Sequence, residues 1–213
     1  ASGKTALAIR LAKLLDGEIV CADSQTVRLE MNIGTAKPTL LEMEGIPHHC
    51  LDLVEPYEEF TLYQYQKLAK RAIEDIQARG KLPIVVGGTG LYVDALYFDF
   101  ELPVIEQGEK AEEYSNLSVD ELQQKIKSKG LELPKNDKNP RHLINVLLRA
   151  GRAGTQNKPS KDSIIIGLKP ERSVLIDRIN NRVEAMIDGG IVEEERGIES
   201  KYGRPPRNLD GRG

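Results

Sequence analysis

The first five residues have the types and the order of a phosphate-binding loop. They are Ala1, Ser2, Gly3, Lys4 and Thr5. The pattern G-x-x-x-x-G-K-[ST] ends in the last three of these residue types, and backbone N–H groups at the start of the following helix point at the bound anion. In this pattern the lysine reaches a terminal phosphate oxygen and the threonine hydroxyl holds Mg²⁺. We therefore expect residues 1–5 to bind phosphate groups and Thr5 to be a ligand of Mg²⁺.

A helix is expected directly after this half-motif, because leucines recur at helical spacing from residue 7 to residue 15. The first glycine of the pattern, and the apolar strand that should precede it, have no counterpart in the sequence. We therefore expect the sequence to be cut at its N-terminus. A strand lost from the centre of a parallel sheet removes backbone hydrogen bonds and burial, so a chain that starts at Ala1 is expected to be unstable.

Asp23 is the next residue that could do chemistry, because it follows a short apolar strand expected over residues 18–22. Ligands of open parallel sheets bind at the carboxyl ends of the strands. At such a position Asp23 could be a Mg²⁺ ligand, as in kinases, or a general base near the group that attacks a phosphorylated substrate. Its carboxylate could instead cap the turn that follows. The residues alone leave these roles open.

A second apolar strand is expected over residues 82–86, and the glycine-rich stretch 87–90 follows it. This stretch could be a second backbone cradle for an anion, or a tight turn from strand to helix. In either case Thr89 falls at the same edge of the sheet as Asp23 and the phosphate loop.

The segment His48-His49-Cys50 contains three potential metal ligands in a row. Adjacent residues rarely point at one ion, and the sequence offers no second pair of ligands at a suitable spacing. We expect a loop that closes over the site rather than a metal centre.

The composition excludes several classes of protein. The 213 residues carry a formal charge of −3, so RNA binding would have to be local. Two cysteines make no disulfide framework and favour a reducing compartment, so we expect a cytoplasmic protein. No apolar run approaches the ~18–20 residues of a membrane helix, and we expect no membrane partner and a monomer.

The order of elements predicts an α/β fold with a parallel sheet flanked by helices. Residues 1–100 and 157–213 are expected to form the catalytic core, with a third buried strand over residues 163–168. Residues 101–156 differ in composition and are expected to form a mostly helical insertion. The stretch 138–161 within and beyond it is locally basic, which fits either RNA binding or a solvated helix face.

Several motifs occur in one order: A-S-G-K-T at 1–5, A-D-S at 22–24, I-G-T-A-K-P at 33–38, G-I-P-H-H at 45–49 and V-G-G-T-G-L-Y at 86–92. Together with N-P-R at 139–141 and R-I-N-N-R-V-E-A-M at 178–186, they make this sequence closely resemble the tRNA dimethylallyltransferases, also called tRNA isopentenyltransferases. The likeness covers most of the chain and is weakest over 101–137 and after 196. It implies a P-loop NTPase-like core and transfer of a dimethylallyl group to the exocyclic amine of the adenine 3′ of the tRNA anticodon.

The resemblance also implies roles for individual residues. The phosphate loop would hold the diphosphate of dimethylallyl diphosphate rather than ATP, with Mg²⁺, and Lys4 and Thr5 would stabilise the charge on the leaving diphosphate. Asp23 would take the proton from the attacking amine. The residues that would meet the flipped-out adenine are Asp23, Ser24, Gln25 and Thr26. Thr89 would help to line the reaction channel, and Arg141 and His142 would grip the tRNA backbone in the insertion.

The sequence departs from the family pattern in places. An arginine expected about twenty residues beyond Thr89 is missing, and Lys110 is the nearest cation. A late G-Y-R motif is also missing, which leads us to expect a cut at the C-terminus, or a copy that has lost function.

Three alternatives to prenyl transfer onto tRNA therefore stay open. They are prenylation of free adenine nucleotides, a nucleotide-binding P-loop kinase that uses ATP, and a non-catalytic tRNA-binding remnant. A kinase would want an aspartate where the second strand ends, and Gly87 and Gly88 stand there instead.

Overall fold

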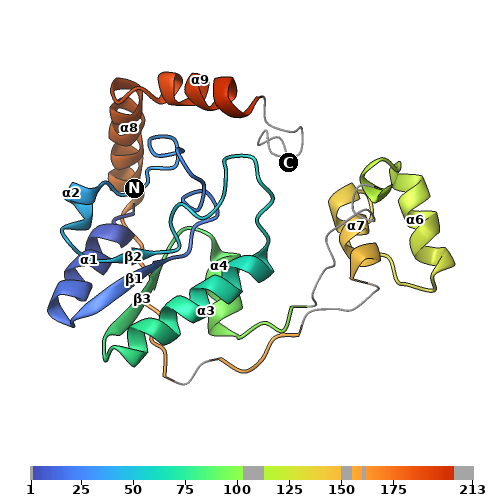
Figure 1. The fold of residues 1–213 in the computed structure, drawn as a ribbon, viewed down its shortest axis with the longest axis horizontal. Coiled ribbons are helices and arrows are strands. Elements are labelled where there is room, and N and C mark those ends of the chain that lie inside the picture. Colours follow the sequence, from blue (N-terminus) through green and yellow to red (C-terminus); the bar gives the residue numbers. More distant parts are fainter. Residues whose placement is uncertain (1, 103–112, 150–154, 160–161, 204–213) are drawn as a thin grey trace. The chain divides into compact units, whose positions relative to one another are not determined.

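A computed structural model describes residues 2–102, 113–149, 155–159 and 162–203. The chain divides into two compact units, one made of Ala1–Phe98 with Pro159–Gly213 and the other of Asp99–Lys158. Figure 1 shows the elements of both units, and each unit is described by itself below.

The first unit is built on a parallel sheet of three strands in the order β2-β1-β3. Strand β1 (Gly17–Cys21) pairs with β2 (His48–His49) on one side and with β3 (Leu82–Val86) on the other. Every residue of β1 is buried, as expected of the central strand of a parallel sheet. The strands predicted over residues 18–22 and 82–86 are therefore confirmed, each within one residue at either end.

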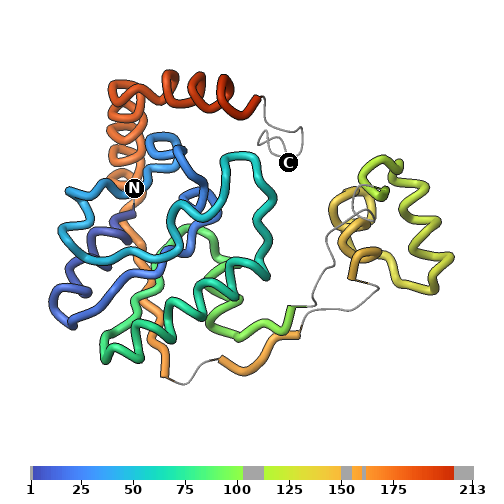
Figure 2. Tube along the Cα trace, in the orientation of Figure 1, coloured from blue at the N-terminus to red at the C-terminus, as the bar shows by residue number. Residues whose placement is uncertain are grey.

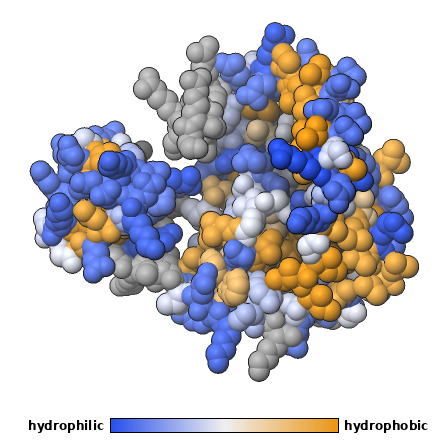
Figure 3. Space-filling model, turned by 180° about the vertical axis from the view of Figure 1, so that it is seen from behind, coloured by the Kyte–Doolittle hydropathy of each residue, from blue (hydrophilic) through white to orange (hydrophobic). Residues whose placement is uncertain are grey.

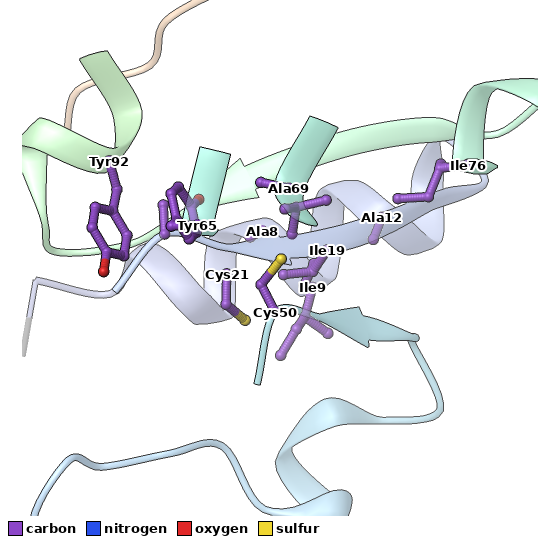
Figure 4. Packing of buried hydrophobic residues seen from close by; sticks show 12 residues of the cluster. Ala8, Ile9, Ala12, Ile19, Cys21, Cys50, Tyr65, Ala69, Ile76 and Tyr92 are labelled. Carbon is purple, nitrogen blue, oxygen red and sulfur yellow. The ribbon is translucent and has the colours of Figure 1, made fainter. Parts of the chain in front are cut away.

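Helices cover this sheet. They are α1 (Lys4–Leu14), α3 (Leu62–Ala78) and α4 (Gly90–Tyr97), with the short α2 (Leu40–Met43) between β1 and β2. Helix α3 begins at a capping box, in which the Thr61 hydroxyl accepts from the Gln64 N–H at 3.2 Å and the Gln64 side chain accepts from the Thr61 N–H at 2.8 Å. Figure 4 shows side chains of α1, β1 and α3 meeting in the core.

Two further helices, α8 (Arg172–Asp188) and α9 (Ile191–Tyr202), complete the described part of the first unit. They meet at Gly190, whose φ of +91° is a backbone conformation that side chains with a Cβ rarely adopt. Figure 2 shows that both helices run beside the loop that follows β1, and hydrogen bonds described below join α9 to it.

The prediction of a third buried strand over residues 163–168 is wrong. The segment pairs with no strand in the described part of the chain, and Ile164, Ile165 and Ile166 are 90%, 61% and 61% exposed. An apolar run forms a strand only where a neighbouring strand pairs with its backbone N–H and C=O groups.

Exposed apolar side chains also come from β3 and α8, and Figure 3 shows apolar side chains gathered on the rear face.

An ion-pair network around the buried carboxylate of Glu18 fixes the end of β1 that lies opposite Asp23. The Glu18 side chain is 2% exposed and accepts two hydrogen bonds from the Arg79 guanidinium, one of them at 2.8 Å. The Nε2 atom of His49 lies 2.8 Å from the same carboxylate. The hydrogen bonds from Arg79 outweigh burial and lower the pKa of Glu18 from 4.5 to about 2.

Acid is therefore expected to destabilise the first unit through Glu18. Because the folded pKa lies below the unfolded value, the stabilisation is complete above about pH 4.5 and is lost as the pH falls towards 2. Arg79→Ala should lower the unfolding midpoint at pH 6 and flatten its fall between pH 4.5 and 2. The matched control is Lys13→Ala, which removes the exposed pair with Glu44. An unchanged acid profile in Arg79→Ala contradicts this account.

The second unit contains α6 (Val119–Ser128) and α7 (Pro140–Leu148). Ser118 and Glu121 form a capping box at the start of α6, and the Asn139 side chain with Pro140 at the first helical position starts α7. The two helices bury an apolar cluster of their own: Tyr114, Leu122, Ile126, Leu143 and Leu147. The spacing of Leu122 and Ile126 in the sequence predicts a helix over residues 118–129, and α6 confirms this prediction. In the described residues we find no helix with the length and apolar character needed to cross a membrane.

Candidate active site

A cavity of about 620 Å³ opens in the first unit where β1 and β3 end. Its wall is made by the residues before and at the start of α1, the residues after β1 and β3, the loop that precedes α2, and α8. This is the edge at which parallel sheets bind ligands. Six of the predicted site residues line it: Ser2, Gly3, Lys4, Thr5, Asp23 and Thr26.

The phosphate loop presents the start of α1 to this cavity. Gly3 precedes the helix with a φ of +87°, and the first backbone hydrogen bond of the helix runs from the Leu7 N–H to the Gly3 carbonyl. The N–H groups of residues 4–6 therefore precede any intrahelical bond, and Gly3 offers no side chain to cap them. The Lys4 ammonium lies 3.0 Å from the Ser2 hydroxyl. Ala1 lies outside the described residues.

Asp23 follows β1 and lines the same cavity as Thr5. One of its oxygens, Oδ1, accepts a hydrogen bond from the Gln25 N–H at 2.9 Å, which fixes the carboxylate in the turn. The carboxylate of Asp23 therefore does cap this turn through Oδ1. Its other oxygen, Oδ2, lies beside Gly88, and a Cβ added to Gly88 would lie 3.0 Å from it. The turn thus orients a carboxylate towards the end of β3.

The ends of β1 and β3 are held together at Thr89. The Thr89 hydroxyl accepts from the Ser24 N–H at 2.9 Å and lies 3.2 Å from the Ser24 hydroxyl. The Thr26 side chain is buried and lines the cavity, whereas Gln25 is exposed. Ser24 and Thr89 thus lie beside the cavity and position the segment that carries Asp23.

Close contact between the two strand ends depends on Gly87. The Ala22 N–H donates to the Val86 carbonyl at 2.8 Å, and the Thr89 N–H donates to the Ala22 carbonyl at 3.2 Å. A Cβ on Gly87 would lie 1.9 Å from that same carbonyl oxygen of Ala22. Residues 87–90 therefore form the expected tight turn from strand to helix, and Gly87 and Gly88 also line the cavity.

Sequence analysis missed the two arginines of the cavity, Arg178 and Arg182 on α8. The Arg178 guanidinium comes within 3.6 Å of the position that a Cβ on Gly3 would take, so it lies against the phosphate loop. Their spacing of four residues places both on one face of the helix, and this was the available signal. With Lys4 they give the cavity three cationic side chains.

The segment His48-His49-Cys50 divides among three environments. His48 lines the cavity, with Nδ1 2.8 Å from the Ile46 carbonyl and a buried Nε2 that has no partner, and burial lowers its pKa. His49 contacts Glu18 instead. Burial raises the pKa of Cys50 to about 11, which opposes the thiolate that a metal requires. In the described ranges no three such side chains cluster to hold a metal ion.

Arg141 and His142 lie in the second unit, at the start of α7. Both are exposed, and the Arg141 N–H donates to the Asn139 side chain at 3.0 Å. Lys110 lies outside the described residues.

The oxygen donors of the cavity suit Mg²⁺. This hard ion takes oxygen ligands, keeps several waters, and is usually held by one or two protein oxygens together with substrate phosphates. Thr5 and Asp23 both line the cavity, and the phosphate loop offers the place for a diphosphate. The donor set therefore fits the ion.

Known proteins match this chain over most of its length. The model of the IPP transferase family matches residues 27–210. The tRNA dimethylallyltransferase of an Exiguobacterium species is 40% identical over 217 residues, which cover 95% of this chain and 69% of the relative. That of Streptococcus agalactiae serotype III is 38% identical, with coverage of 95% and 70%.

Solved structures agree with these relatives. The full-length tRNA isopentenylpyrophosphate transferase of Bacillus halodurans is 36% identical, with a TM-score of 0.69 over 98% of this chain and 70% of its own. A eukaryotic dimethylallyltransferase acting on tRNA is 26% identical, with a TM-score of 0.76 over 95% of this chain and 54% of its own. These neighbours confirm the predicted P-loop NTPase-like α/β fold. The family model, the identity with these relatives and the likeness of the folds show that the chain belongs to the IPP transferase family.

Proposed function

We propose that this protein transfers the dimethylallyl group of dimethylallyl diphosphate to the exocyclic amine of the adenine 3′ of the tRNA anticodon and releases diphosphate. One observation carries the proposal: a single cavity brings the phosphate loop and two arginines together with the carboxylate of Asp23. Cations suit a leaving diphosphate, and a carboxylate suits an amine that must lose a proton. The relatives named above carry the same activity in their names.

The cationic wall of the cavity would bind the donor. Residues 2–5, with the start of α1, would hold the diphosphate through backbone N–H groups and the Lys4 ammonium. Arg178 and Arg182 would add charge-assisted hydrogen bonds to the same group. The Thr5 hydroxyl would hold Mg²⁺, which supplies further charge neutralisation when bound. These groups stabilise negative charge that grows as the C–O bond breaks.

Asp23 would act on the acceptor. The nitrogen of the exocyclic amine forms a bond to the allylic carbon, the bond from that carbon to the diphosphate oxygen breaks, and the Asp23 carboxylate takes the proton that the amine releases. Adenine has to leave the base stack to reach this carboxylate. Four neighbouring residues would contact or position the flipped base: Ser24, Gln25, Thr26 and Thr89.

The helical second unit favours tRNA over a free nucleotide as acceptor. Exposed basic side chains of α7 and its flanks, Arg141 and His142 among them, suit the phosphates of a polynucleotide backbone. A kinase is disfavoured because Gly87 and Gly88 occupy the end of β3, where a P-loop kinase would want an aspartate. We also propose a cytoplasmic location, which suits a tRNA acceptor and the free thiols of Cys21 and Cys50. We further propose that the protein is a monomer, which sedimentation velocity would test.

The test of the proposed function is incorporation of label. The intact protein is incubated with Mg²⁺, radiolabelled dimethylallyl diphosphate and either unmodified tRNA or AMP. We expect label in tRNA, diphosphate released in equal amount, and little label in AMP. Preferential labelling of AMP, or ATP turnover without any prenyl donor, would overturn the assignment in favour of a nucleotide prenyltransferase or a kinase.

The two arginines give a sharper prediction for donor binding. Arg178→Ala and Arg182→Ala should each raise the KM for dimethylallyl diphosphate by about ten- to a hundredfold, because each removes a charge-assisted hydrogen bond worth about 1.5–3 kcal/mol. The KM for tRNA should change less. Arg172→Ala removes an exposed arginine at the start of the same helix and serves as the control. An unchanged donor KM in both variants contradicts a diphosphate role for α8.

A further inference from the structure

The loop that carries the I-G-T-A-K-P motif is a folded part of the cavity wall. Thr35, Ala36 and Pro38 line the cavity. Within the loop the Thr35 hydroxyl donates to the Met31 carbonyl at 2.6 Å, and the Ala36 N–H donates to the Ile33 carbonyl at 2.9 Å. This loop therefore has a defined shape, and its shape determines one side of the cavity.

Three successive backbone N–H groups of this loop point at one carboxylate from a distant part of the chain. The N–H groups of Asn32, Ile33 and Gly34 donate to Glu194 of α9 at 2.8, 2.8 and 2.9 Å. Asn32 and Ile33 share Oε2, and Gly34 bonds Oε1. Hydrogen bonds from amides to an ionised acceptor are about twice as strong as those between neutral groups. Three successive N–H groups also form the kind of concavity that binds anions.

Glu194 lies close in the chain to the arginines of the cavity. Helix α8 carries Arg178 and Arg182, and the turn at Gly190 leads directly into the first turn of α9, where Glu194 stands. The carboxylate thus ties the helix pair that supplies the cations to the loop that supplies Thr35 and Ala36.

We propose that Glu194 is a positioning residue, which holds the loop over residues 32–36 and α8 in the arrangement that binds the prenyl donor. The inference rests on the proposed function only for the identity of that donor. Without the carboxylate, part of the binding free energy of the donor is spent on ordering the loop. The apparent Kd of the donor then equals its intrinsic Kd divided by the fraction of molecules in which the loop is already ordered. Glu194 itself touches no reacting atom in this account.

A second contact between α9 and the same region provides a control for simple helix docking. Lys201 pairs with Glu30, and the Tyr202 hydroxyl lies 3.3 Å from the same carboxylate. The Lys201 and Glu30 side chains are 57% and 46% exposed, so this pair contributes little. Lys201→Ala therefore removes a contact between α9 and this region without freeing the three loop amides.

The experiment combines hydrogen exchange with donor binding in the intact protein. Glu194→Ala should speed exchange of the amides of residues 32–34, and should raise both the Kd of dimethylallyl diphosphate, measured by calorimetry, and its KM by about tenfold. The turnover number should change less than threefold. Glu194→Gln keeps the length and one acceptor oxygen, and should recover part of the affinity. Lys201→Ala and Glu193→Ala, an exposed neighbour on α9, should behave like the wild type.

The outcomes separate this inference from the proposed function. A Glu194→Ala protein with wild-type donor affinity, or with loop amides still protected, overturns the positioning role. If Lys201→Ala weakens donor binding as much as Glu194→Ala does, or if Glu194→Gln recovers no affinity, docking of α9 rather than the three amide hydrogen bonds is responsible, and that result also overturns the positioning role. If the wild type transfers no prenyl group to tRNA, the proposed function fails, and the Kd of the donor still decides the role of Glu194.

Discussion

Asp23→Asn is expected to lower the rate of prenyl transfer by about 10²–10⁴-fold, the usual contribution of a positioned general base. The asparagine carbonyl can still accept the hydrogen bond from the Gln25 N–H, so the turn after β1 should keep its shape. What the variant loses is the group that takes the proton from the amine. Single-turnover transfer at saturating donor and tRNA measures this step without product release.

Two measurements test whether Asp23→Asn changes only the chemical step and not folding or donor binding. Its unfolding midpoint and its Kd for dimethylallyl diphosphate should stay close to those of the wild type. Asp94→Asn, at an exposed aspartate of α4, provides a matched change of charge away from the cavity wall and should transfer normally. A rate above one tenth of the wild type in Asp23→Asn contradicts the role of the carboxylate as the base.

Gly87→Ala is expected to be the most damaging change of a single methyl group. The added Cβ would lie 1.9 Å from the Ala22 carbonyl oxygen, and backbone atoms on both strands would have to move apart. Because Asp23 follows Ala22 directly, the site would be lost with the strand contact. We expect a loss of about 3 kcal/mol or more in the free energy of unfolding, which lowers the midpoint by roughly 10 °C, and no measurable transfer.

Neighbouring glycines provide the controls for this prediction. A Cβ on Gly90 meets nothing within 4 Å, so Gly90→Ala should leave stability unchanged or raise it, because alanine favours the helix that starts there. A Cβ on Gly88 would lie 3.0 Å from Asp23 Oδ2, so Gly88→Ala should reduce transfer more than stability. Equal stability of the alanine variants at positions 87 and 90 would refute the close approach.

The sequence was sufficient where function depends on local patterns. The half-motif at residues 2–5 and the aspartate after an apolar strand predicted two parts of one site, because strand ends of a parallel sheet meet at one edge. Residues 2–5, Asp23 and Thr26 do line a common cavity. The pattern T-x-x-Q at Thr61 and Gln64 is likewise visible in the sequence as a capping box, and α3 begins directly after Thr61.

The sequence was insufficient where function depends on contacts between distant segments. The spacing of Arg178 and Arg182 places both on one face of a helix, but only the path of the chain brings that face to the phosphate loop. Glu194 bonds amides about 160 positions earlier in the chain. The error over residues 163–168 has a related cause, since three consecutive isoleucines indicate strand propensity, but a strand also needs a partner for its backbone groups.

The most direct test of the account is the chemical identity of the product. Unmodified tRNA is incubated with the intact protein, Mg²⁺ and dimethylallyl diphosphate, then digested to nucleosides and analysed by mass spectrometry. We expect one added dimethylallyl group per tRNA, on the exocyclic amine of the adenine 3′ of the anticodon, and far less of this product in the same time with Asp23→Asn. A tRNA that stays unmodified while AMP gains the group, or equal modification by the wild type and Asp23→Asn, would contradict it.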